Sequence, residues 1–142
     1  MPKLILSVLC CCMWGQVCVA EVRLMSILEV QKRVSTGTLL LIDVRSPGEW
    51  KETGLAKGAV PISIHREDGV KGFVSEVRAR TNGNQLRQIA LICASGVRSA
   101  RAAKALEKAG YTSLFNVREG MRGNLKDGPG WLKRSLPLIS WP

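Results

Sequence analysis

The residues best suited to chemistry lie in one short segment around Cys93. Residues 93–99 read Cys-Ala-Ser-Gly-Val-Arg-Ser and directly follow the apolar run Ile-Ala-Leu-Ile. Gly96 permits a sharp turn, so that successive backbone N–H groups can point inward and bind an anion. A helix that begins after this turn adds partial positive charge at its N-terminus, and Arg98 adds a full one. These groups favour thiolate over thiol, and Cys93 is therefore predicted to be a nucleophile.

The simpler interpretation of Cys93 is a buried structural cysteine that happens to precede a helix. Free cysteine is often buried and inert in proteins. The glycine-containing turn and Arg98 argue against this interpretation, because both belong to the surroundings in which cysteine becomes reactive.

The elements that position this segment alternate between strand and helix patterns. Two capping boxes, Ser26 with Glu29 and Ser46 with Glu49, mark the start of helices. The expected helices cover residues 27–36, 47–52, 69–80 and 99–109, with a short one around 131–134. Short apolar runs predict strands over 39–44, 59–64, 89–92 and 114–117. The alternation predicts an α/β fold, with a parallel sheet that carries helices on both faces.

In parallel sheets of this kind, ligands bind outside the carboxyl ends of the strands. Four segments lie at or just after a predicted strand end: residues 43–45, His65, residues 93–98 and Arg118. Among these, Asp43 and Arg45 are expected to support the loop through ion pairs or hydrogen bonds. The role of His65, the single histidine, stays open between a partner of the thiol and a surface position.

The Cys93 segment resembles the active-site loop of the rhodanese family, whose common form is Cys-x-x-Gly-x-Arg followed by Ser or Thr. Further segments resemble the family in the same order along the chain, over about residues 24–138. They are Ile42-Asp43-Val44-Arg45, Glu49-Trp50, Gly54 with Gly58-Ala59, Glu119-Gly120-Met121, and Gly130-Trp131-Leu132 with Leu136-Pro137. The resemblance implies a rhodanese-like parallel sheet.

The resemblance also implies sulfur transfer. The family's thiolate takes a sulfane sulfur from a donor such as thiosulfate, becomes a persulfide and passes the sulfur to cyanide or a thiol. On this chain Cys93 takes that role, and Arg98 supports the loop and attracts the anionic donor. The outer sulfur is expected to bind the backbone of the loop residues Ala94, Ser95, Gly96, Val97, Arg98 and Ser99. Neither a metal nor an organic cofactor is implied.

Two positions depart from the family pattern. Leu55 stands where a histidine is common, and Ala94 stands where many thiosulfate-using members carry a basic residue. The second departure weakens the expectation of thiosulfate as donor, and persulfides and polysulfides are alternatives. It also motivates a second hypothesis: a sulfane-sulfur carrier that loads Cys93 once and hands the sulfur to a partner protein.

A third hypothesis is a phosphatase or arsenate reductase of related fold. These enzymes place five residues between the cysteine and the arginine, and the longer loop surrounds a tetrahedral oxyanion. Here four residues separate Cys93 from Arg98. The tighter loop suits a single sulfur atom better, and the sequence places no general acid for a phosphate leaving group.

The first twenty residues have the pattern of a signal peptide. Lys3 precedes an apolar run over 4–14, and Cys18-Val19-Ala20 ends the segment with small residues. We therefore expect a signal peptide over 1–20, a rhodanese domain over 21–142, and a periplasmic or secreted protein without stable membrane insertion after cleavage. An uncleaved membrane anchor is the alternative. Four of the five cysteines lie in the signal, so the mature chain would keep Cys93 alone.

The net charge of the chain indicates which classes of partner it can bind. The chain has a net charge of +10, with 21 basic and 11 acidic residues. Nucleic-acid binding calls for clustered charge with interleaved aromatic residues, but the basic residues come at most in pairs and aromatic residues are few. The balance fits a small anionic sulfur donor, with a thiol, cyanide or a sulfur-accepting protein as acceptor.

Overall fold

The structure is a computed structural model that describes residues 20–142 of the chain. The expected signal peptide therefore lies outside the described residues, apart from Ala20. Within residues 20–142, no helix has the length and apolar character needed to cross a membrane.

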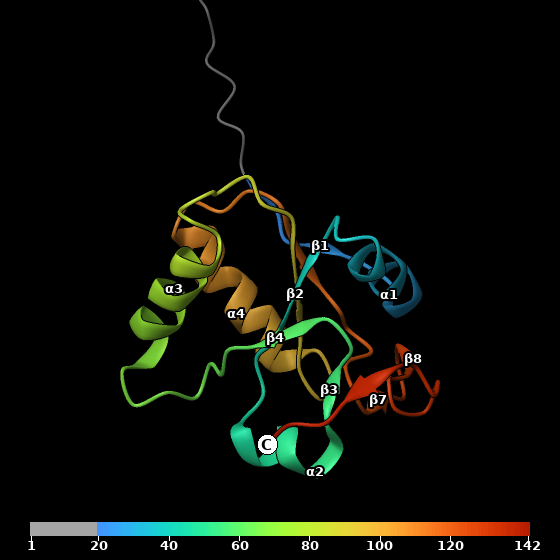
Figure 1. Cartoon of the computed structure of the whole chain (residues 1–142). Coiled ribbons are helices and arrows are strands. Elements are labelled where there is room, and N and C mark those ends of the chain that lie inside the picture. Colours follow the sequence, from blue (N-terminus) through green and yellow to red (C-terminus); the bar gives the residue numbers. More distant parts are fainter. Residues whose placement is uncertain (1–19) are drawn as a thin grey trace, which may run out of the picture.

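A five-stranded parallel sheet forms the centre of the molecule (Figure 1). Its strand order is β1-β6-β5-β2-β4, and every neighbouring pair is parallel. The strands are β1 (Arg23–Leu24), β2 (Leu40–Asp43), β4 (Ala59–Pro61), β5 (Ile89–Ile92) and β6 (Leu114–Asn116). The predicted α/β class with a parallel sheet is confirmed.

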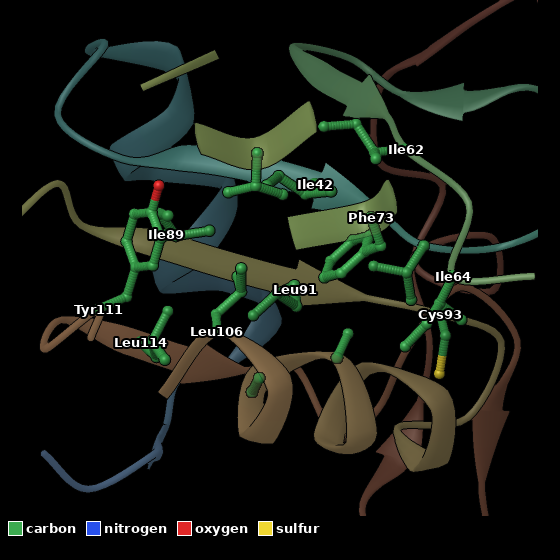
Figure 2. Close-up of a cluster of buried hydrophobic side chains, with 14 residues drawn as sticks. Ile42, Ile62, Ile64, Phe73, Ile89, Leu91, Cys93, Leu106, Tyr111 and Leu114 are labelled. Atoms are coloured by element: carbon green, nitrogen blue, oxygen red, sulfur yellow. The ribbon is translucent and has the colours of Figure 1, made fainter. Parts of the chain in front are cut away.

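The four helices are α1 (Ile27–Ser35), α2 (Pro47–Thr53), α3 (Gly69–Arg80) and α4 (Val97–Lys108). Side chains that alternate along β5 face two separate cores. Ile89 and Leu91 pack with α3 and α4 on one face, as Figure 2 shows, and Ala90 and Ile92 pack with α1 on the other. The apolar strands are thus buried on both faces, as the continuous apolar runs predicted.

The predicted short helix around 131–134 is wrong. The structure has turns there: the Arg134 N–H bonds to the Gly130 carbonyl with helical spacing, but the Ser135 N–H bonds to the Leu132 carbonyl and Ser135 has a positive φ of 52°, so the helical spacing does not continue. The backbone N–H groups of Trp131 and Leu132 bond to the distant carbonyl oxygens of Gly120 and Met121. The Trp131 side chain is fully buried, and its indole N–H donates to the Pro137 carbonyl at 2.9 Å. Residues 131–137 therefore cover the sheet as an irregular segment held by long-range contacts.

Two small antiparallel pairs complete the fold. β3 (Leu55–Ala56) pairs with β9 (Leu138–Ile139), and β7 (Gly123–Asn124) pairs with β8 (Gly128–Pro129). Both pairs lie on the side of the molecule where α2 follows the carboxyl end of β2 (Figure 1). The two pairs therefore lie near the edge of the central sheet at which the Cys93 loop begins.

Candidate active site

Cys93 is the first residue after β5, and its side chain is 1 % exposed. The Gly96 N–H donates to Cys93 Sγ at 3.1 Å, and the Ser99 hydroxyl lies 3.3 Å from the same sulfur. Ser99 is itself fully buried in the first turn of α4. The sulfur therefore lies in a small enclosure whose polar groups, one amide and one hydroxyl, are both uncharged.

The loop reaches this shape through Gly96, the residue that precedes α4. Gly96 has a φ of 90°, in the left-handed region that favours glycine. A Cβ atom at this position would lie 2.6 Å from the Arg118 carbonyl oxygen. Gly96 thus permits both the reversal that brings its N–H to the sulfur and the close approach of the backbone at Arg118.

The segment after β6 holds the loop from outside through its backbone. The Met121 N–H donates to the Cys93 carbonyl at 2.8 Å, and the Arg122 N–H donates to the Ala94 carbonyl at 2.9 Å. The Asn116 side-chain amide donates to the Gly96 carbonyl at 3.1 Å. These bonds fix the carbonyl groups of the loop outward, and leave the Gly96 N–H facing the sulfur.

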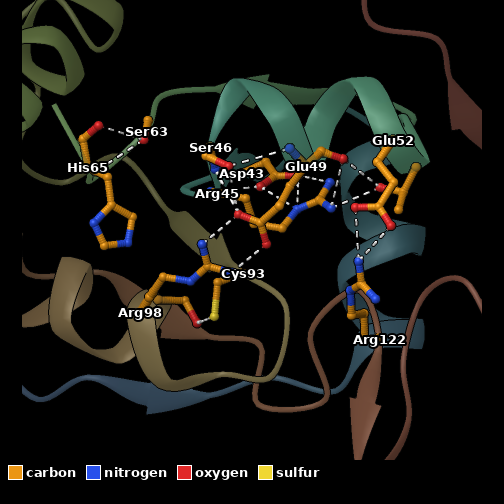
Figure 3. Close-up of polar contacts among 12 residues, drawn as sticks. Asp43, Arg45, Ser46, Glu49, Glu52, Ser63, His65, Cys93, Arg98 and Arg122 are labelled. Atoms are coloured by element: carbon orange, nitrogen blue, oxygen red, sulfur yellow. Dashed lines mark hydrogen bonds and ion pairs between the residues drawn. The ribbon is translucent and has the colours of Figure 1, made fainter.

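Arg98 points to Glu49 on α2. Its two terminal nitrogens donate to the two carboxylate oxygens of Glu49, each at 2.7 Å (Figure 3). Glu49 also accepts from the backbone N–H of Ser46, which completes a capping box on α2. The hydrogen bonds from Arg98 are the main cause that lowers the pKa of Glu49 from 4.5 to about 2. The guanidinium thus connects the loop to α2 through a bidentate ion pair.

Asp43 and Arg45 form a second, fully buried ion pair at the end of β2, with 2.8 Å between Arg45 Nη2 and Asp43 Oδ2. Arg45 also donates to the Gly54 carbonyl and the Thr53 hydroxyl, both at 2.9 Å. The pair therefore holds the C-terminal end of α2, while Glu49 on the same helix meets Arg98. The pair supports the loop indirectly, through α2 and the ion pair of Glu49 with Arg98.

The remaining predicted positions lie around the mouth of the loop. Ser95 and Val97 are exposed and Ala94 is half-buried. Arg118 pairs with Asp127 at 3.1 Å. The exposed His65 donates its backbone N–H to the Ser63 hydroxyl, and none of its hydrogen bonds within residues 20–142 reaches the sulfur. The described part of the chain has no group of three or more His, Cys, Asp or Glu residues arranged to hold a metal ion.

Three residues of the site were not predicted from the sequence: Glu49, Asn116 and Gly120. Glu49 was identified as a capping residue and as part of a family motif, but not as the partner of Arg98, which lies 49 positions away. Gly120 has a φ of 65°, and a Cβ atom there would lie 2.4 Å from the Ala94 carbonyl oxygen. For Glu49 and Gly120, the sequence did hold an indication of a role in the site, because the segments that contain them resemble family motifs.

The family model for the rhodanese-like domain matches residues 26–126 of the chain, which include every element described around Cys93. The chain belongs to the rhodanese-like domain family. Among its relatives, an uncharacterised protein of Rickettsia prowazekii, RP600, is 30 % identical over 102 residues, which cover 68 % of this chain and 80 % of the relative. A sulfurtransferase of Allochromatium vinosum is 26 % identical over 110 residues, with 78 % and 87 % covered.

The fold of this rhodanese-like chain is also found among solved structures. The polysulfide-sulfur transferase homodimer of Wolinella succinogenes superposes with a TM-score of 0.62 at 24 % identity, over 87 % of this chain and 82 % of that one. Together, the family and its relatives support a role in sulfur transfer.

Gly120 offers a test of how the loop is held. Gly120→Ala should lower the free energy of unfolding by about 1 kcal/mol through backbone strain and by about 1–3 kcal/mol more through the clash with Ala94. It should also reduce sulfur transfer, since the loop must shift. Gly37→Ala is the matched control, because Gly37 has a similar φ of 71° with nothing within 4 Å of the added atom. Urea unfolding of both variants measures the difference, and equal losses would contradict the contact.

The lowered pKa of Glu49 predicts how the stability of the protein depends on pH. Because its pKa in the folded protein, about 2, lies below the ordinary value of 4.5, ionised Glu49 stabilises the folded state above about pH 4.5. That stabilisation should be lost as the pH falls from 4.5 toward 2. The difference in free energy of unfolding between the wild type and Glu49→Gln should therefore be largest near neutral pH and shrink over this window.

The control for the pH test is Glu52→Gln, since Glu52 lies on the same helix and pairs with Arg122 in an exposed ion pair. This variant should follow the wild type closely at every pH. A Glu49→Gln difference that stays constant between pH 2 and pH 7 would show that folding does not lower the pKa of Glu49, and would contradict the ion pair with Arg98.

Proposed function

We propose that this protein is a sulfurtransferase that carries sulfane sulfur on Cys93 as a persulfide. The observation that carries the proposal is the enclosure of Cys93 Sγ by the Gly96 N–H at 3.1 Å and the Ser99 hydroxyl at 3.3 Å. A hydrogen-bond donor directed at the sulfur stabilises negative charge there, as the thiolate and the persulfide anion both require.

The reaction has two steps. The Cys93 thiolate attacks the terminal sulfur of the donor, a bond forms between Sγ and that sulfur, and the donor's sulfur–sulfur bond breaks. Its electron pair leaves with sulfite, with a thiolate or with a shortened polysulfide. The acceptor, cyanide or a thiolate, then attacks the outer sulfur, and the electron pair of the persulfide bond returns to Sγ. The protein ends as it began, without any external oxidant or reductant.

The size of the loop favours a sulfur atom over an oxyanion. Four residues separate Cys93 from Arg98, and the guanidinium of Arg98 is engaged by Glu49 rather than directed into the enclosure. A phosphate or arsenate carries several charged oxygens that each need a donor. The enclosure offers one amide and one hydroxyl to the sulfur, which suits a single outer atom.

The side chains around Cys93 Sγ favour some sulfur donors over others. With Ala94 at the loop and Arg98 paired, no cationic side chain of the described residues hydrogen-bonds to Cys93 Sγ. A persulfide releases a thiolate, which is a monoanion, whereas thiosulfate releases sulfite, which is a compact dianion. A polysulfide also releases a dianion, but its two negative charges lie at the two ends of a sulfur chain rather than on one small group. We therefore propose persulfides or polysulfides as the preferred donors, with thiosulfate as a slower one.

Removal of the thiol tests the function. With a polysulfide donor and cyanide, the wild type should form thiocyanate and Cys93→Ser should form it only at the uncatalysed rate. Ser99→Ala, which loses one hydrogen bond near the sulfur, should retain activity reduced about tenfold. Colorimetric thiocyanate measurement reports both rates. Equal rates for wild type and Cys93→Ser would overturn the function, whereas one stable sulfur adduct with slow turnover would identify a carrier.

We propose further that residues 1–20 are a signal peptide, removed on export to a bacterial periplasm or to the exterior. The support is the order of a basic residue, a short apolar run and small residues in the sequence. The protein would then work in an oxidising compartment without a second cysteine that could form an internal disulfide with Cys93.

Mass spectrometry of the protein purified from its native cell tests the cleavage. After reduction, unfolding and treatment with iodoacetamide, the mature chain should begin at Glu21 and carry one modified cysteine. A chain that retains residues 1–20 would carry five modified cysteines, in agreement with the count for the full sequence. That second result would show an uncleaved segment and contradict removal of a signal peptide.

A further inference from the structure

An exposed apolar and basic surface lies beside the Cys93 loop, and the chemistry at the sulfur does not require it. Within residues 20–142, Leu125 is fully exposed and Val97 is 75 % exposed. We define the acceptor surface by its exposed residues Ser95, Val97, Leu125, Lys126, Pro129 and Lys133. We propose that it binds an acidic segment of a protein whose cysteine accepts the sulfur. This inference rests on the proposed sulfurtransferase function.

The contacts of Asn124 place this surface at the loop. The Asn124 side-chain amide donates to the Arg118 carbonyl at 2.9 Å and approaches the Ser95 carbonyl at 3.5 Å. The next residue, Leu125, stands at the turn between β7 and β8, and Val97 follows Ser95 by two positions. The exposed leucine and valine therefore lie within one and two residues, respectively, of the contact between Asn124 and Ser95.

A hollow continues the acceptor surface along the β7–β8 pair. It has a volume of about 460 Å³ and is lined by Leu125, Pro129 and Lys133 together with Gly123, Asn124 and Gly128. Apolar side chains beside an open hollow are typical of surfaces that bind a protein segment. The hollow gives an incoming chain a place to lie while its cysteine approaches the loop.

The charge around the hollow selects the partner. Residues 118–134 include five basic and two acidic residues. Both acidic residues are engaged, Asp127 by Arg118 at 3.1 Å and Glu119 by the Ile27 N–H at 3.2 Å. Lys126 and Lys133, by contrast, form no ion pair with any described residue. A partner with acidic side chains around its cysteine complements this surface.

Because Cys93 is buried, transfer to a protein thiol requires a surface beside the loop that orients the acceptor. Sγ is enclosed and the Cys93 side chain is 1 % exposed, so an acceptor thiol must approach through the loop mouth in a defined orientation. Cyanide is small and needs no orientation beyond the loop itself. A cysteine in a peptide segment is oriented by the residues on both sides of it, and those residues meet Leu125 and the two lysines.

The experiment compares sulfur transfer from the loaded protein to three acceptors: cyanide, acetyl-Glu-Leu-Cys-Leu-Glu-amide and acetyl-Lys-Leu-Cys-Leu-Lys-amide. Mass spectrometry follows loss of the extra sulfur from the protein and its gain by the peptide. At low ionic strength the acidic peptide should react at least about fivefold faster than the basic one, and added salt should reduce the difference.

Variants at the acceptor surface should separate the peptide from cyanide. The double variant Lys126→Glu with Lys133→Glu should reverse the preference between the peptides, and Leu125→Ser should slow both peptides about threefold. Neither change should alter thiocyanate formation, because these side chains do not touch the sulfur.

Two control variants carry substitutions of the same types, one Leu→Ser and one Lys→Glu, at the opposite edge of the sheet. Leu86→Ser replaces a leucine that is 73 % exposed before β5, and Lys108→Glu replaces an exposed lysine at the end of α4. Both should behave as wild type toward all acceptors. Equal rates for the two peptides, or equal effects of control and surface variants, would overturn the acceptor surface while cyanide turnover still supported the function. Absence of turnover with every acceptor would overturn both.

Discussion

The hydrogen bond from the Gly96 N–H to Cys93 Sγ is the interaction on which the site depends. It requires the chain to reverse direction within three residues of a buried strand and to enter α4 at once. A left-handed glycine at position 96 makes the reversal possible. The same reversal would leave the loop's carbonyl groups without partners, and the backbone of residues 121 and 122, together with Asn116, supplies donors to them.

The second constraint is the position of α2. Arg98 cannot turn into the enclosure while both of its terminal nitrogens bind Glu49, and Glu49 can hold it only because the capping box and Arg45 fix the two ends of α2. Charge is therefore kept at the loop mouth, while the polar groups at the sulfur are neutral. This separation favours a persulfide anion that is stabilised by dipoles yet still open to attack.

The sequence predicted what is local and periodic. The four longer strands of the sheet, the helix over 69–80, the capping box at Ser46 and the Cys93 loop all follow from residues close in the chain. Contacts across the fold were missed, since nothing in the local pattern pairs Glu49 with Arg98. The strands of two residues show no periodicity to detect. The helix expected around 131–134 does not form, because helical bonding ends after one turn, where Ser135 takes a positive φ.

The most direct test of this account is a crystal structure of the protein after treatment with polysulfide. We expect one additional sulfur atom bonded to Cys93 Sγ, enclosed by the loop and within hydrogen-bond distance of backbone N–H groups of residues 94–99, with Arg98 still bound to Glu49. An unmodified Sγ, or an added sulfur directed away from those amides while Arg98 leaves Glu49 to reach it, would contradict the account.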